Sequence, residues 1–173
     1  TGAFTDLGTL DTHSATISWG DGEFSTATIV GGTIAGEHIY TSGGLFRIVV
    51  TLTDDDTGQA IAQTFALITG VGVLNGQLVA IGTKGADDIR VNLSSNGQFV
   101  VHTSFLADSP RLLPAEGVTS IAMILCDGDD RATIASTIAL PVYIAAEEGN
   151  DELNGGGGPN ILLGGEGDDR EER

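Results

Sequence analysis

The last part of the 173-residue chain repeats every nine residues. Three consecutive copies have a glycine at the fourth place and a short polar residue two places later. The glycines are Gly149, Gly158 and Gly167, and the polar residues are Asp151, Asn160 and Asp169. Glycine allows the backbone to turn through positive φ, and aspartate supplies an anionic oxygen. A short, fixed interval of this kind predicts strands that stack as successive circuits of a parallel coil.

In a coil with two turns per circuit, copies eighteen residues apart stack on the same side. Asp151 and Asp169 would then face one shared site, and Asn160, a further candidate ligand, would lie on the opposite edge. Ca²⁺ prefers oxygen ligands of this kind. The backbone carbonyls expected to complete the shell are those of Glu147, Gly149, Glu166 and Gly167. Asx residues also favour ordinary turns, but three copies in one register favour calcium.

Aspartates recur upstream at similar intervals. Counting from Asp87, the spacings are 21, 22, 21 and 18 residues, through Asp108 and Asp130 to the two terminal aspartates. We expect one ladder of carboxylates along a corner, with rungs about 4.7–4.9 Å apart. Carboxylates this close repel by roughly 1 kcal/mol in water and by more near a protein surface. The ladder therefore predicts bound cations, with Asp87 and Asp130 as weaker candidates and Asp108, beside Pro110, as the weakest.

The charge balance restricts the partners of the chain. It has 24 acidic and 7 basic residues, for a net charge of −17. Nucleic acid and anionic membrane surfaces would repel it, whereas divalent cations would be attracted. No stretch is as long as the roughly eighteen apolar residues of a membrane span. We therefore expect calcium ions as partners, without nucleic-acid binding or membrane insertion.

The composition favours short strands and tight turns. Aromatic residues make up 5% of the chain and glycine contributes 26 residues, while β-branched residues are plentiful. The first part alternates as half-buried strands do, with Ala15, Ile17 and Trp19 on one face. Residues 69–72 look like a short linker. We expect an all-β protein with one domain at residues 1–68 and a second at 73–173.

Four motifs in the first domain are similar to motifs of a known protein family. They are Phe4-Thr5-Asp6, Trp19-Gly20-Asp21-Gly22, His38-Ile39-Tyr40 and Asp54-Asp55-Asp56-Thr57-Gly58. In this order they resemble a polycystic-kidney-disease (PKD) type domain over residues 1 to about 68. The resemblance implies an Ig-like β-sandwich of the kind found in surface and secreted proteins, where it acts as a spacer, adhesive or binding module.

Residues 73–173 resemble the hemolysin-type calcium-binding (RTX) repeat family, strongly from residue 147 onward and loosely before it. The resemblance implies a parallel β-helix or β-roll that folds with calcium outside the cell. Three departures from the family predict weaker or fewer sites. Ala146-Glu147-Glu148 replaces the first glycine pair, Asn160 replaces an aspartate, and Glu171 stands where leucine is expected.

Other side chains have plainer interpretations. Asp21 and Asp54–Asp56 are interpreted as two exposed acidic turns rather than as a second calcium site. Trp19 and Tyr40 are expected in the core. Cys126, the sole cysteine, is expected to pack as a small hydrophobe. The three histidines have no zinc-binding spacing.

No catalytic motif stands out, so we expect a non-enzymatic segment. The sequence predicts a structural or adhesive piece of a large secreted or cell-surface protein, stabilised by Ca²⁺ in its Gly/Asp turns. Its further partners would be a cell-surface protein or a polysaccharide. Two alternatives stay open. One is a carbohydrate-binding or targeting module attached to an extracellular hydrolase, and the other is a polysaccharide lyase or epimerase using Arg90, Arg111 and Arg131.

Overall fold

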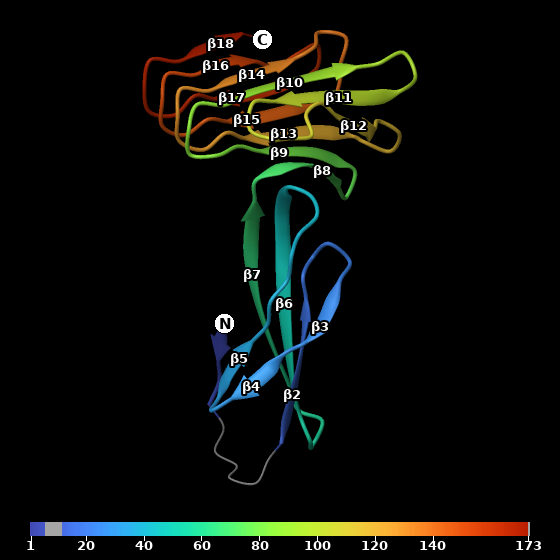
Figure 1. The fold of residues 1–173 in the computed structure, drawn as a ribbon, viewed down its shortest axis with the longest axis vertical. Helices are drawn as coiled ribbons and strands as arrows, with labels where there is room; N and C mark the ends of the chain where they lie inside the picture. The colour runs from blue at the N-terminus through green and yellow to red at the C-terminus, as the bar shows by residue number, and fades with distance from the viewer. Residues whose placement is uncertain (6–11, 173) are drawn as a thin grey trace. The chain divides into compact units, whose positions relative to one another are not determined.

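The computed structural model describes residues 1–5 and 12–172. All regular elements in this range are β-strands, which confirms the predicted all-β class (Figure 1). No helix of the described range is long and apolar enough to cross a membrane. The chain divides into two compact units, Thr1–Thr41 with Leu45–Leu67 and Ser42–Gly44 with Ile68–Arg173. Asp6 of the first motif lies outside the described residues.

The first unit is built from two sheets. The smaller sheet has the order β1-β5-β4 and consists of β1 (Gly2–Ala3), β5 (Thr33–Ala35) and β4 (Thr28–Val30). The larger sheet has the order β3-β2-β6-β7 and consists of β3 (Phe24–Thr26), β2 (His13–Ser18), β6 (Gly44–Asp54) and β7 (Gln59–Ile68). The predicted alternation holds in β2, because Ala15 and Ile17 are buried while Thr16 is exposed.

The tryptophan and H-x-Y motifs meet inside this unit. The Trp19 indole stacks on the His38 imidazole with ring centroids 5.0 Å apart, and Tyr40 meets the imidazole edge-on at 4.6 Å. The Asp21 carboxylate lies 2.6 Å from His38 Nε2, and the Tyr40 hydroxyl donates to the Trp19 carbonyl oxygen. Trp19 is buried, as predicted, and Tyr40 is half-buried against Phe46. These motif residues therefore contact one another by ring packing and by hydrogen bonds inside the unit.

Replacing Asp21 with alanine is expected to lower the free energy of unfolding of the first unit by about 2 kcal/mol. Burial alone would raise the pKa of Asp21, but hydrogen bonds from His38 and the Glu23 N–H hold that pKa below its usual value. The substitution leaves both donors without a charged acceptor. Chemical denaturation followed by the fluorescence of Trp19, the only tryptophan, measures the loss. Exposed Glu37→Ala is the control, and equal stability of the two variants would contradict the prediction.

The second unit also contains two sheets. The six-stranded sheet has the order β12-β11-β10-β14-β16-β18 and consists of β12 (Arg111–Pro114), β11 (Gln98–Thr103), β10 (Asp88–Leu93), β14 (Arg131–Ile134), β16 (Glu152–Asn154) and β18 (Arg170–Glu172). The five-stranded sheet has the order β17-β15-β13-β9-β8 and consists of β17 (Asn160–Leu163), β15 (Val142–Ala145), β13 (Ser120–Ile124), β9 (Gln77–Ile81) and β8 (Gly70–Leu74). From β12 to β18 the chain passes alternately from one sheet to the other, whereas β8 and β9 are consecutive in the five-stranded sheet and β10, β11 and β12 in the six-stranded sheet.

Parallel pairing aligns successive circuits in this unit. Strands β10, β14, β16 and β18 pair in parallel, as do β9, β13, β15 and β17. Ile89, Ala132 and Leu153 therefore occupy matching positions, and all three are buried in one apolar cluster between the sheets. Glu171 is next in this register, and its carboxylate accepts the Gly164 N–H at 3.2 Å. The aligned apolar row thus ends at a charged residue.

The linker predicted at residues 69–72 is wrong, because most of it belongs to strand β8. Val71 is fully buried, and β8 pairs antiparallel with β9 through a turn at Asn75 and Gly76, which both have positive φ. Asn-Gly is a strong hairpin signal. The glycines of the segment allow close packing, since a Cβ at Gly72 would lie 2.9 Å from the Gly43 carbonyl oxygen.

Two further predictions are corrected in this unit. Asp108 does not join the other aspartates, because β11 and β12 form antiparallel additions beside β10 and Asp108 lies in the loop between them. Its carboxylate pairs with Arg111 at 3.2 Å and is 63% exposed. Cys126 is half-buried and begins a turn at φ 70°, so it does not pack in the core. The buried residue there is Leu125.

Candidate metal site at the acidic corner

Four turns connect the five-stranded sheet to the six-stranded sheet, and we call them the acidic corner. They are residues 83–87, 126–130, 147–151 and 165–169. Each ends in an aspartate immediately before a strand of the six-stranded sheet. Parallel pairing of those strands fixes the register of the turns. The four aspartates therefore lie on successive rungs, and we call Asp87, Asp130, Asp151 and Asp169 the inner ladder.

Hydrogen bonds join the rungs of the inner ladder. The Asp87 N–H donates to Asp130 Oδ1 at 2.7 Å, and the Asp130 N–H donates to Asp151 Oδ1 at 2.8 Å. The Asp151 N–H donates to Asp169 Oδ1 at 3.0 Å. One oxygen of each of the last three carboxylates is therefore satisfied by the backbone of the preceding circuit.

The second oxygens of two rungs are buried without a hydrogen-bond partner. They are Asp130 Oδ2 and Asp151 Oδ2, and each residue is only 2% exposed. Burial raises the pKa of Asp130 to about 7, and the nearby Asp87, Asp151 and Asp129 carboxylates add to the rise. Burial, and then the charge of Asp169, raise the pKa of Asp151. A buried carboxylate oxygen without a partner is costly, so these two groups call for a cation or a proton.

Glycines bring the turns of the corner close together. Gly128, Gly149 and Gly167 all have φ between 131° and 145°. A Cβ at Gly149 would overlap the Gly128 carbonyl oxygen, and one at Gly167 would overlap the Gly149 carbonyl oxygen. The Gly149 N–H donates to the Glu166 carbonyl oxygen at 2.9 Å, and the Glu166 N–H donates to that of Glu147 at 2.8 Å. Carbonyl oxygens of one turn therefore lie against the backbone of the adjacent turn.

Replacing Gly149 with alanine is expected to lower the free energy of unfolding of the second unit by about 3 kcal/mol, because the methyl group adds overlap to backbone strain. Gly117→Ala is the matched control. Gly117 has φ 78°, but a Cβ there meets nothing within 4 Å, so only about 1 kcal/mol of strain is expected. Chemical denaturation followed by far-UV circular dichroism compares the two. Equal losses would contradict close packing at the corner.

The candidate ligands fall into two places. Most lie at the acidic corner: Asp87, Asp130, Glu147, Gly149, Asp151, Glu166, Gly167 and Asp169. The side chains of Glu147 and Glu166 are exposed, so only their carbonyl oxygens face the neighbouring turns. Asn160 begins β17 in the other sheet, and its amide donates to the Gly156 carbonyl oxygen at 3.3 Å. Asn160 is therefore not part of the corner.

The first rung differs from the others because of Thr83, whose role the sequence alone did not indicate. The Thr83 N–H donates to Asp87 Oδ2 at 2.6 Å, and its hydroxyl lies 3.2 and 3.1 Å from the two carboxylate oxygens. Asp87 therefore has partners for both oxygens and offers no unpaired atom. A hydroxyl residue four places before the aspartate was the available sequence signal, and no other turn of the corner has one.

A second row of polar residues runs beside the inner ladder. The Asn150 N–H and side-chain amide donate to Asp129 Oδ1 at 2.9 and 3.1 Å. The Asp168 N–H donates to Asn150 Oδ1 at 3.0 Å. We call Asp129, Asn150 and Asp168 the outer ladder. It hydrogen-bonds the last three turns to one another and was also missed at the sequence level.

The corner differs from a site made of side chains alone. Among the residues that the structure describes, no three His, Cys, Asp or Glu side chains gather in a metal-binding group. A cation at the corner would therefore take carboxylate oxygens from adjacent rungs and the rest of its shell from backbone carbonyls. Hard oxygen donors of this mixed kind suit Ca²⁺, which accepts flexible coordination by six to eight oxygens.

The other acidic residues and the arginines lie elsewhere. Antiparallel pairing of β2 with β6 places Ser18 opposite Val49 and His13 opposite Asp54. Asp21 and the Asp54–Asp56 turn therefore lie at opposite ends of the strand pair. Each arginine considered for polysaccharide chemistry has a partner: Arg90 bonds to Asp88, Arg131 to Glu152, and Arg111 to Asp108 and the Val71 carbonyl oxygen.

No protein-family model, curated protein or solved structure matches the chain.

Proposed function

We propose that the chain is a calcium-dependent structural or adhesive segment of a larger extracellular protein. The observation that carries the proposal is the pair of unpaired, buried oxygens, Asp130 Oδ2 and Asp151 Oδ2. Removing one partner from a buried charge is strongly destabilising, and a bound cation would supply that partner. The net charge of −17 supports a cationic ligand.

The proposal includes a finer architecture and a family for each unit. An Ig-like sandwich of the PKD type is supported by the order of the motifs and by the two sheets of the first unit. A β-roll of the RTX type is supported by the second unit, because each circuit contributes one parallel strand to each of its two sheets. Eighteen residues separate the last two aspartates of the inner ladder, which equals two nine-residue repeats.

Calcium, when bound, would supply positive charge that offsets the carboxylates of the corner. The chain contributes the arrangement: parallel strands hold the turns in register, glycines bring their carbonyls together, and Asp130, Asp151 and Asp169 present anionic oxygens. An unfolded chain holds none of these groups in register. Binding therefore favours the folded state by RT ln(1 + [L]/Kd). Extracellular modules bind calcium with Kd of about 10⁻⁴–10⁻³ M, which is the range proposed here.

The unpaired oxygens also set the expected number of sites. One ion for each of Asp130 Oδ2 and Asp151 Oδ2 gives two sites, and the first rung adds none because Thr83 satisfies Asp87. Isothermal titration of the full chain with CaCl₂ is expected to give a stoichiometry of about two. Asp130→Asn should reduce it, and Asp87→Asn is the matched control that should not. No calcium binding, or loss of a site on Asp87→Asn, would contradict the assignment.

A further inference from the structure

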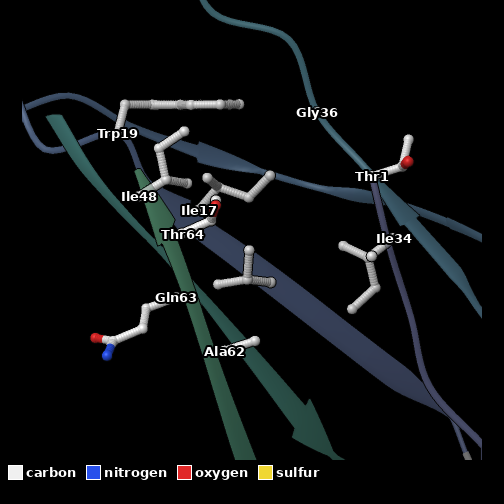
Figure 2. A pocket seen from close by; sticks show the side chains of 11 residues that line it. Thr1, Ile17, Trp19, Ile34, Gly36, Ile48, Ala62, Gln63 and Thr64 are labelled. Atoms are coloured by element: carbon white, nitrogen blue, oxygen red, sulfur yellow. The ribbon is translucent and has the colours of Figure 1, made fainter. Parts of the chain in front are cut away.

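The first unit contains an apolar hollow between its two sheets (Figure 2). Its volume is about 290 Å³, and Ile17, Trp19, Ile34, Ile48 and Val50 supply most of its apolar lining. Figure 2 shows the side chains of Ile17, Ile34 and Ala62 around the space, with Gln63 directed away from it. A hollow of this size in a sandwich core leaves room for side chains that the described residues do not provide.

The hollow lies between two sheet edges. Gly2 of β1 and Ala62 and Thr64 of β7 line it, and β1 and β7 are the last strands of their respective sheets. Strand β1 has two residues, whereas β7 has ten. In the part of the chain that the structure describes, β7 pairs on one side only, with β6. Alternate residues of such an edge direct N–H and C=O groups outward, which makes it a template for another strand.

Strand β7 lacks the features that usually block edge pairing. It has no lysine, no proline and no charged residue over Gln59–Ile68. Every residue from Gln59 to Leu67 is exposed or half-exposed, including Ile61 at 68% and Phe65 at 60%. Natural proteins normally protect an exposed, apolar edge with charges, proline or a covering element. Among the described residues, an apolar edge without these protections therefore borders an apolar hollow.

We propose that the first unit binds an extended segment of another polypeptide by β-strand addition to β7. The main chain of the segment would pair with the free edge, and its alternate side chains would enter the hollow beside Ala62 and Thr64. This mode takes affinity from main-chain hydrogen bonds and specificity from pockets for alternate side chains. A compact small molecule would fill the hollow but leave the backbone groups of the edge unpaired.

The charge of the unit specifies the partner further. Arg47 is the only lysine or arginine between residues 1 and 67, against eight acidic residues. Pairing of two copies through β7 would bring two acidic units together and is opposed by repulsion. The matching segment is therefore apolar at alternate positions and carries Lys or Arg at its ends.

The test uses the full chain and a set of capped decapeptides. Each peptide has Val, Ile, Leu or Phe at alternate positions, Thr between them and Lys at both ends. Trp19 is the only tryptophan and lines the hollow, so its emission reports binding there. Hydrogen exchange over β7 reports edge pairing independently. Control peptides have the same composition with the apolar residues in one block.

At least one alternating peptide is expected to change Trp19 emission saturably, to slow exchange in β7, and to bind at least about tenfold more tightly than its block control. Ala62→Leu fills the hollow and should weaken binding about tenfold or more. Ile61→Ala, on the opposite face of the same strand, should change it by less than about twofold.

Three results would overturn the proposal. They are no response to any peptide, equal binding of alternating and block peptides, and self-association of the free chain that Ala62→Leu abolishes, which would assign the edge to a second copy. Sedimentation velocity of the free chain distinguishes the last case. Peptide binding is expected to be the same in EDTA and in calcium. A failure of this proposal can therefore be distinguished from a failure of the proposed calcium binding at the acidic corner.

Discussion

Replacing Asp151 with alanine is expected to cause the largest loss of stability, about 5 kcal/mol of unfolding free energy in calcium at about 100 times the Kd. One site at that saturation contributes about 2.7 kcal/mol, and Asp151 stands between Asp130 and Asp169, so its loss affects both proposed sites. The Asp130 N–H also loses its acceptor. Urea denaturation in CaCl₂ and in EDTA, with hydrogen exchange to localise the change to residues 131–172, measures the effect.

Asp151→Asn separates the cation from the hydrogen bond. The amide oxygen still accepts the Asp130 N–H, but the buried negative charge is gone. In EDTA this variant should be at least as stable as the wild type, and in calcium it should be less stable. Asp108→Ala, which changes an exposed carboxylate that pairs with Arg111 and not with the ladder, is the control and should behave as the wild type in both buffers. The same rank order of variants in both buffers would contradict calcium binding at Asp151.

The second large effect is a dependence on pH in the absence of calcium. The pKa of Asp130 is raised by burial to about 7 in the folded state and is about 3.9 for an unfolded aspartate. Well below pH 4 the carboxyl is protonated in both states. Between about pH 4 and 7 the unfolded state releases its proton first, so stability falls as the pH rises. The expected loss is about 4 kcal/mol across this interval.

Calcium should reduce this loss, because a nearby positive charge favours the ionised carboxylate. Asp130→Asn should remove the part of the loss that comes from Asp130, since the amide does not titrate in this range, and leave the part that comes from the raised pKa of Asp151. Denaturation midpoints at several pH values, in EDTA and in CaCl₂, give both comparisons. A stability that rises from pH 4 to 7 in EDTA would show that Asp130 is already paired in the metal-free protein.

The sequence indicated those parts of the fold that depend on local periodicity. Alternation in Ala15, Ile17 and Trp19 predicted a strand face that is buried in the structure. The interval between Asp151 and Asp169 predicted that the two residues lie on one side, and the Asp151 N–H does bond to the Asp169 carboxylate. Both inferences depend only on the spacing of residues along a strand or around one circuit of the coil. Residues close together in the sequence determine that spacing.

The sequence was misleading where insertions break the period. Asp108 fits the spacing of the ladder, but β11 and β12 form antiparallel additions before the chain returns to the corner at Asp130. A 43-residue step from Asp87 to Asp130 therefore replaces two expected steps. Spacing alone cannot distinguish one long excursion from two regular circuits, because each places a polar residue after an apolar strand.

The sequence also could not show how the carboxylates are used. Thr83 bonds both oxygens of Asp87, whereas Asp130 and Asp151 each retain an unpaired oxygen. All three residues follow a glycine by two places, so the motif is the same. The difference arises from contacts across the turn and between circuits, which the motif does not record.

Anomalous scattering from crystals grown in CaCl₂ would locate calcium bound at the acidic corner. Calcium scatters anomalously at long X-ray wavelengths, so its position does not depend on interpreting density as water or metal. We expect two peaks at the acidic corner, one at about 2.3–2.6 Å from Asp130 Oδ2 and one at about the same distance from Asp151 Oδ2. A corner without peaks, in which both oxygens are protonated or bonded to water at saturating calcium, would contradict it.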